Sequence, residues 1–243
     1  MTAPHFFVER ATPIEPGRRI ALSEEDSKHA LRSMRLRPGE TVTVADDEGL
    51  WATGTLVGEE DRRAVIHLQD VRPVSRREAI VSVALAPPKG DRLAWAVQKL
   101  GELGVDELVL VPTSRSIRSW SGDRAARAAG RLRSIAREAA MQSRRPFIMP
   151  VAIASNLEEA VDVAATVVVL WEGAQTPLHQ ALPTDEAAVR LVVGPEGGFS
   201  EDELGAATSR GAALATLGPG ILRTETAAVV GATLALARYG RLG

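Results

Sequence analysis

The hydrophobic pattern of this 243-residue chain changes near residue 72. Before this point, short stretches of alternating apolar and polar residues are separated by clusters of turn-forming residues, as in β-strands. We predict strands at residues 41–45, 51–57 and 64–68. One helix precedes them, because Ser23 and Asp26 have the spacing of an N-cap and an acidic third residue, and it should run to Met34. Residues 1–72 are therefore expected to form a small β-rich domain.

Strands alternate with helices in the rest of the chain. Residues 71–77 lack any periodicity and are the predicted linker. Residues 80–86 form a near-continuous apolar run, as expected for a strand buried on both faces. Further strands are predicted at residues 107–111, 166–171, 190–193 and 213–217, and helices at 91–104, 123–143, 157–163, 201–210 and 224–238. This alternation predicts an α/β domain, residues 73–243, with a mainly parallel sheet and helices on both faces.

The composition narrows the class of protein. Hydrophobic residues make up 45% of the chain and charged residues 25%, which is typical of a globular protein. No apolar run reaches the roughly 18 residues of a membrane span, and the first ten residues lack the apolar core of a secretory signal. There is no cysteine, and the four histidines are scattered. We expect a cytoplasmic protein with no membrane segment and no metal.

Basic residues are concentrated in one segment, since nine arginines lie between Arg115 and Arg145 against only Asp123 and Glu138. On the predicted helix of residues 123–143, the apolar positions share one arc and the arginines occupy the rest of the surface. Such a face can bind the phosphates of a nucleic acid. It is equally compatible with a solvated helix face that binds nothing.

Three loops follow predicted strands and contain unusual residues. Ligands of open α/β sheets bind at the carboxyl ends of the strands, where residues 170–173, 193–200 and 217–227 are expected. The second loop has three glycines but matches neither a dinucleotide loop nor a P-loop, and Pro195 and Glu196 place a rigid ring and an anion where a diphosphate would lie. A nucleoside without phosphates fits better. A tight turn that needs glycine for its backbone alone explains the pattern equally well.

The third loop combines two glycines and a proline with a polar triplet at the start of a helix. Arg223, Thr224 and Glu225 stand where the helix should begin, which is a common place for a ligand site. In the alternative interpretation, Thr224 is simply the helix cap, and Arg223 and Glu225 are surface residues.

At these residues the chain resembles the RsmE family of SPOUT methyltransferases, which are 16S ribosomal RNA (uracil-N3)-methyltransferases. The matching motifs are VGPEGGFS at residues 193–200, and LGP followed by ILRTETA within residues 217–227. Weaker matches are found at residues 29–32, 89–91, 98–105 and 136–144. The motifs occur in the family's order and cover nearly the whole chain. The chain departs from the pattern at Gly220, where a larger residue is expected, and at Met141.

The resemblance implies a fold, a cofactor and partners. The α/β domain should carry a deep trefoil knot at its C-terminal end, and the N-terminal domain should be a small PUA-like β-barrel that helps to hold RNA. The protein should be a homodimer that acts on 16S rRNA or on the 30S subunit. The three loops should bind S-adenosylmethionine through Leu170, Trp171, Glu172, Gly194, Pro195, Glu196, Gly197, Leu217, Gly218, Pro219, Ile221 and Leu222.

The chemistry of methyl transfer to uracil N3 suggests roles for three residues. The N3 proton must leave, so the reaction needs a general base or a group that stabilises the uracil anion. Arg223 is the candidate for stabilising the anion or holding a phosphate, and Glu225 is the candidate base or the partner that orients Arg223. Glu138 is a weaker candidate, because its helix could instead form the dimer interface.

The last predictions from the sequence concern the residues that contact RNA and the alternative functions of the chain. The residues predicted to contact RNA are Arg32, Lys89, Arg92, Arg115, Arg118, Arg124, Arg127, Arg131 and Arg144. The nearest alternative is a SPOUT methyltransferase that acts on a ribose 2′-hydroxyl or on a different base. An alternative from another class is a non-catalytic RNA-binding factor for ribosome assembly.

Overall fold

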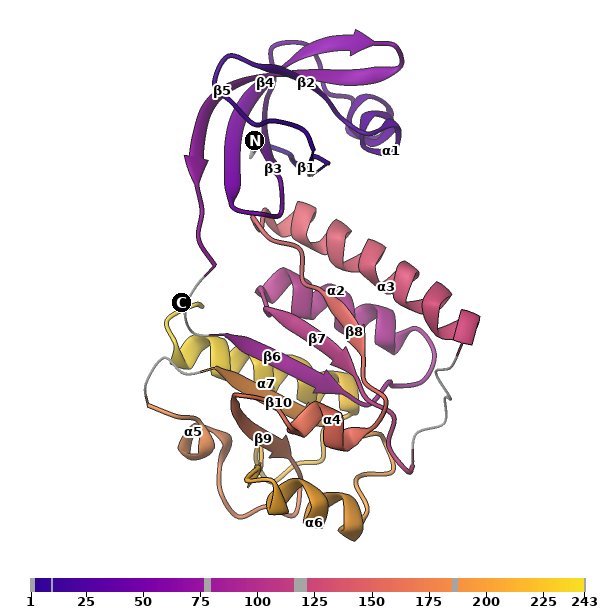
Figure 1. Ribbon diagram of the computed structural model, residues 1–243, viewed down its shortest axis with the longest axis vertical. Helices are drawn as coiled ribbons and strands as arrows, with labels where there is room; N and C mark the ends of the chain where they lie inside the picture. Colours follow the sequence, from indigo (N-terminus) through magenta and orange to yellow (C-terminus); the bar gives the residue numbers. More distant parts are fainter. Residues whose placement is uncertain (1–2, 10, 77–79, 116–121, 185–187, 243) are drawn as a thin grey trace. The chain divides into compact units, whose positions relative to one another are not determined.

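The computed structural model describes residues 3–9, 11–76, 80–115, 122–184 and 188–242 (Figure 1). The side chains of residues 122–126 are not described. The chain divides into two compact units. We call residues 1–76 with 140–148 the β unit, and residues 77–139 with 149–243 the α/β unit.

The β unit contains a five-stranded sheet of order β1-β3-β4-β5-β2. Its strands are β1 (His5–Phe7), β2 (Arg19–Ala21), β3 (Thr41–Ala45), β4 (Leu50–Glu60) and β5 (Arg63–Pro73). β1 runs parallel to β3, and the other pairs are antiparallel. The three predicted strands are confirmed. The two additional strands, β1 and β2, have only three residues each, too few to show a period.

The predicted linker at residues 71–77 is wrong at its start. β5 continues through Pro73, which pairs with Leu50 of β4. The two strands form a long hairpin whose turn residues, Asp61 and Arg62, have φ of 48° and 64°. Positive φ at both central residues matches the twist of the flanking strands. The strands can therefore stay paired beyond the residues whose apolar and polar alternation predicted them.

The helix of the β unit begins where the sequence predicts. The Ser23 side chain accepts a hydrogen bond from the backbone N–H of Asp26, and α1 (Glu24–Lys28) follows. The helix continues as a π-helical turn, His29–Ser33, and ends before Met34. The main core of the unit forms around Phe6, Leu56 and Leu68, among other buried residues.

Residues 140–148 belong to the β unit although they lie far away in sequence. Ala140 packs with Phe7 and Ala45 in a small apolar cluster. The backbone N–H of Ile148 donates to Asp47 Oδ1 at 2.7 Å. These contacts explain why the end of α3 (Gly122–Ser143) and the residues after it group with the N-terminal strands.

The α/β unit contains a six-stranded sheet of order β11-β9-β10-β6-β7-β8, in which every pair is parallel. Its strands are β6 (Val81–Leu85), β7 (Glu107–Leu110), β8 (Val151–Ile153), β9 (Thr166–Leu170), β10 (Val189–Val193) and β11 (Ala213–Ala215). The predicted parallel α/β sheet is confirmed. β8 was not predicted, because three residues give no distinctive pattern.

Helices cover both faces of this sheet, as predicted. On one face, Gly231 of α7 (Thr224–Arg238) lies so close to Leu170 and Leu191 that a Cβ would be 2.7 Å from the Leu170 side chain. On this side α2 (Arg92–Leu103) packs against α7. On the other face, α4 (Leu157–Val161) and α6 (Glu201–Ser209) share a core with the strands. A short helix, α5 (Leu178–Ala181), was not predicted and packs near α7.

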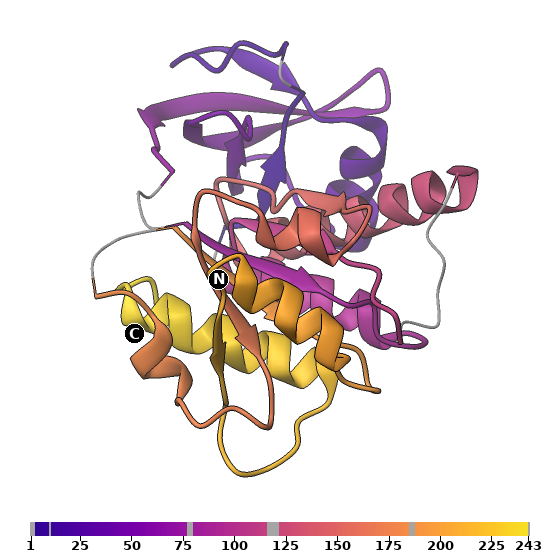
Figure 2. The ribbon, with the colours of Figure 1, turned by 60° about the horizontal axis from the view of Figure 1, so that its bottom comes forward.

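The ends of two helices follow the sequence signals. α2 stops at Gly104, whose φ of 81° is the left-handed conformation that glycine adopts readily. Ser200 and Glu203 form the predicted capping box at the start of α6. The path from β10 through α6 and β11 to α7 can be followed in Figure 2 as the colour changes from orange to yellow. The trefoil knot remains a prediction, because strand order and pairing do not by themselves define how a chain is threaded.

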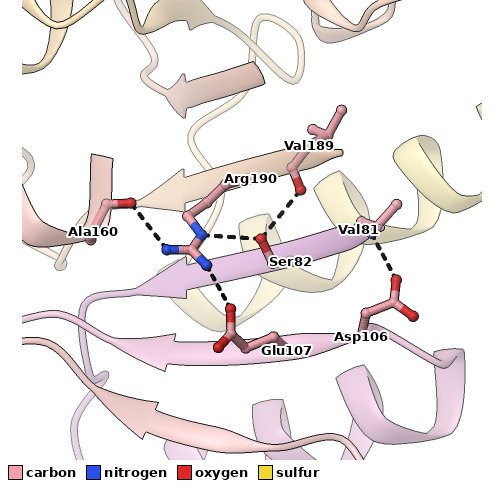
Figure 3. A network of polar contacts seen from close by, with 7 residues as sticks. All are labelled: Val81, Ser82, Asp106, Glu107, Ala160, Val189 and Arg190. Atoms are coloured by element: carbon pink, nitrogen blue, oxygen red, sulfur yellow. Dashed lines mark hydrogen bonds and ion pairs between the residues drawn. The ribbon is translucent and has the colours of Figure 1, made fainter. Parts of the chain in front are cut away.

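A charged network joins β6, β7, β10 and α4 (Figure 3). The Arg190 guanidinium donates to Glu107 Oε2 at 2.5 Å, to Ser82 Oγ at 3.1 Å and to the carbonyl of Ala160 at 3.3 Å. Ser82 in turn donates to the carbonyl of Val189 at 3.3 Å. Only 11% of the Arg190 side chain is exposed, so these bonds replace water that the guanidinium would otherwise need.

We predict that Arg190→Ala lowers the free energy of unfolding by about 2–3 kcal/mol, because it removes three hydrogen bonds from a largely buried charged group. Urea denaturation measures this change. The matched control is Arg210→Ala, which breaks the exposed ion pair with Glu158 at 2.6 Å. This control should cost less than about 1 kcal/mol. Equal losses in the two variants would show that the network does not hold the sheet together.

Candidate cofactor site

A cavity of about 250 Å³ lies at the carboxyl ends of β9, β10 and β11, where a ligand of a parallel sheet is expected. The loops that follow these strands and the start of α7 form its walls. The lining residues are Leu170, Trp171, Glu172, Val193, Gly194, Pro195, Glu196, Gly198, Phe199, Thr216, Leu217, Gly218, Gly220, Ile221, Leu222, Arg223, Thr224 and Ala227.

The cavity brings together most of the residues that the sequence predicts for the cofactor. The predicted residues that line it are Leu170, Trp171, Glu172, Gly194, Pro195, Glu196, Leu217, Gly218, Ile221 and Leu222. Gly197 and Pro219 belong to the same loops but do not line the cavity. Phe199 and Ala227 lie in the predicted loops but were not named as cofactor residues, and Thr216 lies just outside those loops. Their positions in the sequence could have identified them. Phe199 follows a glycine loop, Thr216 follows a strand, and Ala227 is in the first turn of a helix.

The glycines of the loop after β10 are required by its shape. Gly198 has φ of 68°, and its N–H donates to the carbonyl of Pro195 at 2.9 Å, which closes a tight turn. A Cβ on Gly194 would lie 2.8 Å from the ring of Phe199. This loop can therefore be both a tight turn that needs glycine and part of a ligand site, since the turn is itself a wall of the cavity.

The start of α7 is joined to the loop after β10. The Thr224 hydroxyl donates to the carbonyl of Gly194 at 3.0 Å. The N-cap of α7 is Arg223, whose side chain makes no capping hydrogen bond. The interpretation of Thr224 as a simple cap is therefore wrong. Thr224 is buried because its hydroxyl satisfies a carbonyl of the neighbouring loop.

Two arginines predicted to contact RNA are in contact with the loops around the cavity. Arg115 Nη1 donates to the carbonyl of Gly197 at 2.8 Å and to that of Phe199 at 3.4 Å. Arg92 forms ion pairs with Glu196 and Glu225, at 3.6 Å and 3.7 Å. Both arginines stabilise the loops in this structure.

The remaining predicted RNA residues are more dispersed. Lys89, Arg127 and Arg131 are exposed in the α/β unit. Arg32 is exposed and Arg144 is half-buried, and both belong to the β unit. Arg118 and the side chain of Arg124 lie outside the described residues.

The three predicted catalytic residues have different environments. Arg223 is exposed and lines the cavity, whereas Glu138 is exposed on α3 and does not line it. Glu225 is 8% exposed, in the first turn of α7. The interpretation of Glu225 as a surface residue is therefore wrong, because its helix packs against α2. Among the described residues, no cluster of three or more His, Asp or Glu could hold a metal ion, and no helix is long and apolar enough to cross a membrane.

Glu203 connects the loop after β7 to the start of α6. Its carboxylate accepts backbone N–H bonds from Ser114 at 2.7 Å and from Ser200 at 2.8 Å. Burial raises the pKa of Glu203, but the hydrogen bonds from Ser200 and Ser114 together outweigh this effect and hold the pKa below its ordinary value of 4.5. The ionised carboxylate is therefore the form that supports this corner of the site.

We predict that Glu203→Gln makes the protein less stable at neutral pH by about 1 kcal/mol. A lowered folded-state pKa means that the contribution of Glu203 is present above the ordinary value of 4.5 and is lost as the pH falls through the folded-state pKa. Stability of the variant should consequently fall less steeply in acid, as urea denaturation from about pH 3 to pH 7 can measure. The control is Glu201→Gln, an exposed neighbour in the same turn. An identical acid profile for both variants would contradict the role of Glu203.

Comparison with known proteins identifies the family. The profile of an RNA methyltransferase domain matches residues 76–236, and that of an RNA methyltransferase PUA domain matches residues 22–69. Ribosomal RNA small subunit methyltransferase E of Mycobacterium bovis is 34% identical over 240 residues, which cover 95% of this chain and 90% of that protein. The Bacillus subtilis protein of the same name is 28% identical over 235 residues, which cover 91% of each.

A solved structure agrees with these matches in fold. The crystal structure of a ribosomal RNA small subunit methyltransferase E from Neisseria gonorrhoeae, bound to S-adenosyl methionine, superimposes with a TM-score of 0.86 at 28% identity. The superposition covers 97% of this chain and 98% of that one. The resemblance found in the motifs is thus confirmed over nearly the whole length, and the chain belongs to the family of RNA methyltransferases that includes the ribosomal RNA small subunit methyltransferases E.

Proposed function

We propose that this RNA methyltransferase transfers a methyl group from S-adenosylmethionine to N3 of a uridine in 16S ribosomal RNA. The observation that carries the proposal is the cavity, in which the predicted motif loops converge at the carboxyl ends of three parallel strands. A non-catalytic assembly factor would have no need to keep these loops together around a cavity with Arg223 at its wall.

The walls suit a nucleoside cofactor without phosphates. Leu170, Leu217 and Ile221 provide apolar surface, while the loop after β10 presents backbone polar groups. Glu172 and Glu196 also line the cavity against one cation, Arg223, so negative charges outnumber positive ones in the lining and disfavour a diphosphate. S-adenosylmethionine carries a positive sulfonium and no phosphate, so its charge agrees with this lining. When bound, it supplies an activated methyl group for an in-line displacement.

The protein's main task in such a reaction is to align the nucleophile with the methyl carbon and sulfur, which can supply roughly 7–11 kcal/mol. We propose that Arg223, exposed at the cavity wall, stabilises the negative charge that develops on the uracil ring. Glu225, two residues further along, is the proposed acceptor for the N3 proton. Neither glutamate lines the cavity itself, but Glu225 adjoins the lining residue Thr224 whereas Glu138 lies on α3, so Glu138 is the weaker candidate.

For the RNA substrate, we propose contacts from both units. Arg127 and Arg131 are exposed on α3 and Lys89 is exposed before α2, as sequence-independent phosphate binding requires. The β unit, which matches an RNA methyltransferase PUA domain, adds the exposed Arg32. Either free 16S rRNA or the 30S subunit would serve as substrate, and both would place the enzyme in the cytoplasm.

A methyl-transfer assay tests the function. Purified protein is incubated with labelled S-adenosylmethionine and either unmodified 30S subunits or free 16S rRNA, and the nucleosides of the product are analysed. We expect label in 3-methyluridine. Label in a ribose-methylated nucleoside or in another base would support S-adenosylmethionine as the cofactor but show that uridine N3 is not the methyl acceptor. Cofactor binding that cannot be detected would favour the assembly-factor alternative.

The control for this assay is Arg223→Ala. Because Arg223 is exposed and makes no capping bond, the variant should fold and still bind the cofactor. Loss of a group that stabilises charge in the transition state typically lowers turnover by about 10²–10³-fold. Unchanged turnover of the folded variant would remove the proposed role of Arg223.

We also propose that the protein is a homodimer that associates through the face formed by α2 and α7. These two helices pack together and leave Trp95 and Leu234 each 44% exposed, and Ile221 before α7 is 87% exposed. Exposed large apolar side chains on adjoining elements are typical of an interaction surface. A second copy is the proposed occupant, because a symmetric dimer can bury the same patch on both chains.

Light scattering should therefore give a mass about twice the 25.9 kDa of one chain. Leu234→Asp should shift the protein towards the monomer, because a charge would be buried at the interface. The control is Val57→Asp, a residue of the β unit that is 41% exposed. A monomeric native protein, or equal dissociation of both variants, would argue against this interface.

A further inference from the structure

Arg92 is the first residue of α2, and its side chain interacts with two loops of the site. Its Nη1 lies 3.6 Å from Glu196 Oε1, and its Nε lies 3.7 Å from Glu225 Oε1. Glu196 comes from the loop after β10, and Glu225 comes from the first turn of α7. One guanidinium thus connects three segments of the chain that surround the cavity.

Glu196 has a second contact on the same side. Its Oε1 accepts the backbone N–H of Lys89 at 3.3 Å. Because Glu196 also lines the cavity, the position of its carboxylate affects the space available to the cofactor. Without the Arg92 guanidinium, the Lys89 N–H would be the remaining partner of this carboxylate among the described residues.

Glu225 is the second partner of Arg92, and its carboxylate is buried. It is 8% exposed, and its Oε2 is buried without a hydrogen-bond partner among the described residues. A buried carboxylate oxygen without a donor is costly, so such oxygens usually bind a ligand or a water molecule. The Oε1 atom faces Arg92. The carboxylate is therefore held at one oxygen, while the other is enclosed without a donor among the described residues.

We propose that Arg92 is a positioning residue for methyl transfer: its pairing with Glu225 holds the first turn of α7 beside Arg223, and its pairing with Glu196 fixes that wall of the cofactor cavity. The proposal rests on the function proposed above and deepens it. It replaces the sequence prediction that Arg92 contacts RNA. Two carboxylates within 3.7 Å already compensate the charge of its guanidinium, so it would attract a phosphate weakly.

The test uses Arg92→Gln, which removes the charge, and Arg92→Lys, which retains the charge but loses the planar fork. Three quantities are measured: the Kd of S-adenosylmethionine by calorimetry, the RNA affinity and its salt dependence by filter binding, and the single-turnover rate with both substrates saturating. Misplacement of a reacting group by about 1 Å can cost 10²-fold, so we expect a loss of about that size in the rate of Arg92→Gln. Its RNA affinity and salt slope should stay within about twofold of the native values. Arg92→Lys should recover part of the rate.

Two further variants calibrate the measurements. Arg210→Gln removes a surface arginine that pairs with Glu158, outside the site, and all three quantities should be native. Arg131→Gln removes an exposed arginine of α3, and it should weaken RNA binding and reduce the salt slope by about 1, as for a phosphate contact. If Arg92→Gln behaves like Arg131→Gln in RNA binding and has a native single-turnover rate, Arg92 is a phosphate contact and the proposal is wrong.

Double-mutant cycles identify the partners through which Arg92 acts. If Arg92 works through Glu225, adding Glu225→Gln to Arg92→Gln should slow single-turnover transfer hardly further than Glu225→Gln alone, whereas independent roles would multiply the losses. The same cycle with Glu196→Gln is read in the Kd of S-adenosylmethionine. This second readout requires no RNA and no methyl transfer. Label in a nucleoside other than 3-methyluridine would show that the proposed substrate is wrong, and the coupling energies from the cycles would still be valid. Additive effects in both cycles would show that Arg92 acts through neither glutamate, and the proposed role of Arg92 would be wrong.

Discussion

The parallel register of β9, β10 and β11 is the constraint on which the site depends. Val193 at the end of β10 and Ala215 at the end of β11 both pair with Leu170 at the end of β9. The three strands therefore end at the same level, and the loops that leave them start side by side. Side chains alternate across a sheet, so a slip of one residue would exchange the two faces of a strand and displace its loop. Apolar packing on both faces fixes the register and, through it, the cavity.

Polar contacts then join the loops to one another. The Thr224 hydroxyl bonds to the carbonyl of Gly194, and the Arg115 guanidinium bonds to the carbonyl of Gly197. Tight glycine turns leave carbonyl groups without partners in regular structure, and such groups need donors. An arginine offers five N–H donors in a rigid arrangement, so it can satisfy these groups as well as it can bind phosphate. A basic residue next to a nucleic-acid enzyme's site therefore need not contact the nucleic acid.

Much of the fold could be predicted because its signals are local. Strand β6 lies in an apolar run that is interrupted at Ser82; Ser200 and Glu203 have the spacing of a capping box, and Gly104 ends α2. The elements that escaped prediction, such as β8, are too short to show a period. The start of the linker was misplaced because the pairing of Pro73 with Leu50 depends on the partner strand and not on local alternation.

The class of the fold, the family and the loops of the site could be read from the amino-acid sequence, because periodicity, turn residues and ordered motifs are properties of neighbouring positions. Which side chains of those loops meet depends on the tertiary structure. It buried Glu225 beside Arg92, placed Arg115 against the loop after β10, and left Glu138 outside the cavity. Burial and ion pairing depend on residues that are distant in sequence, so the same arginine can be a phosphate contact or an internal support until packing assigns its partner.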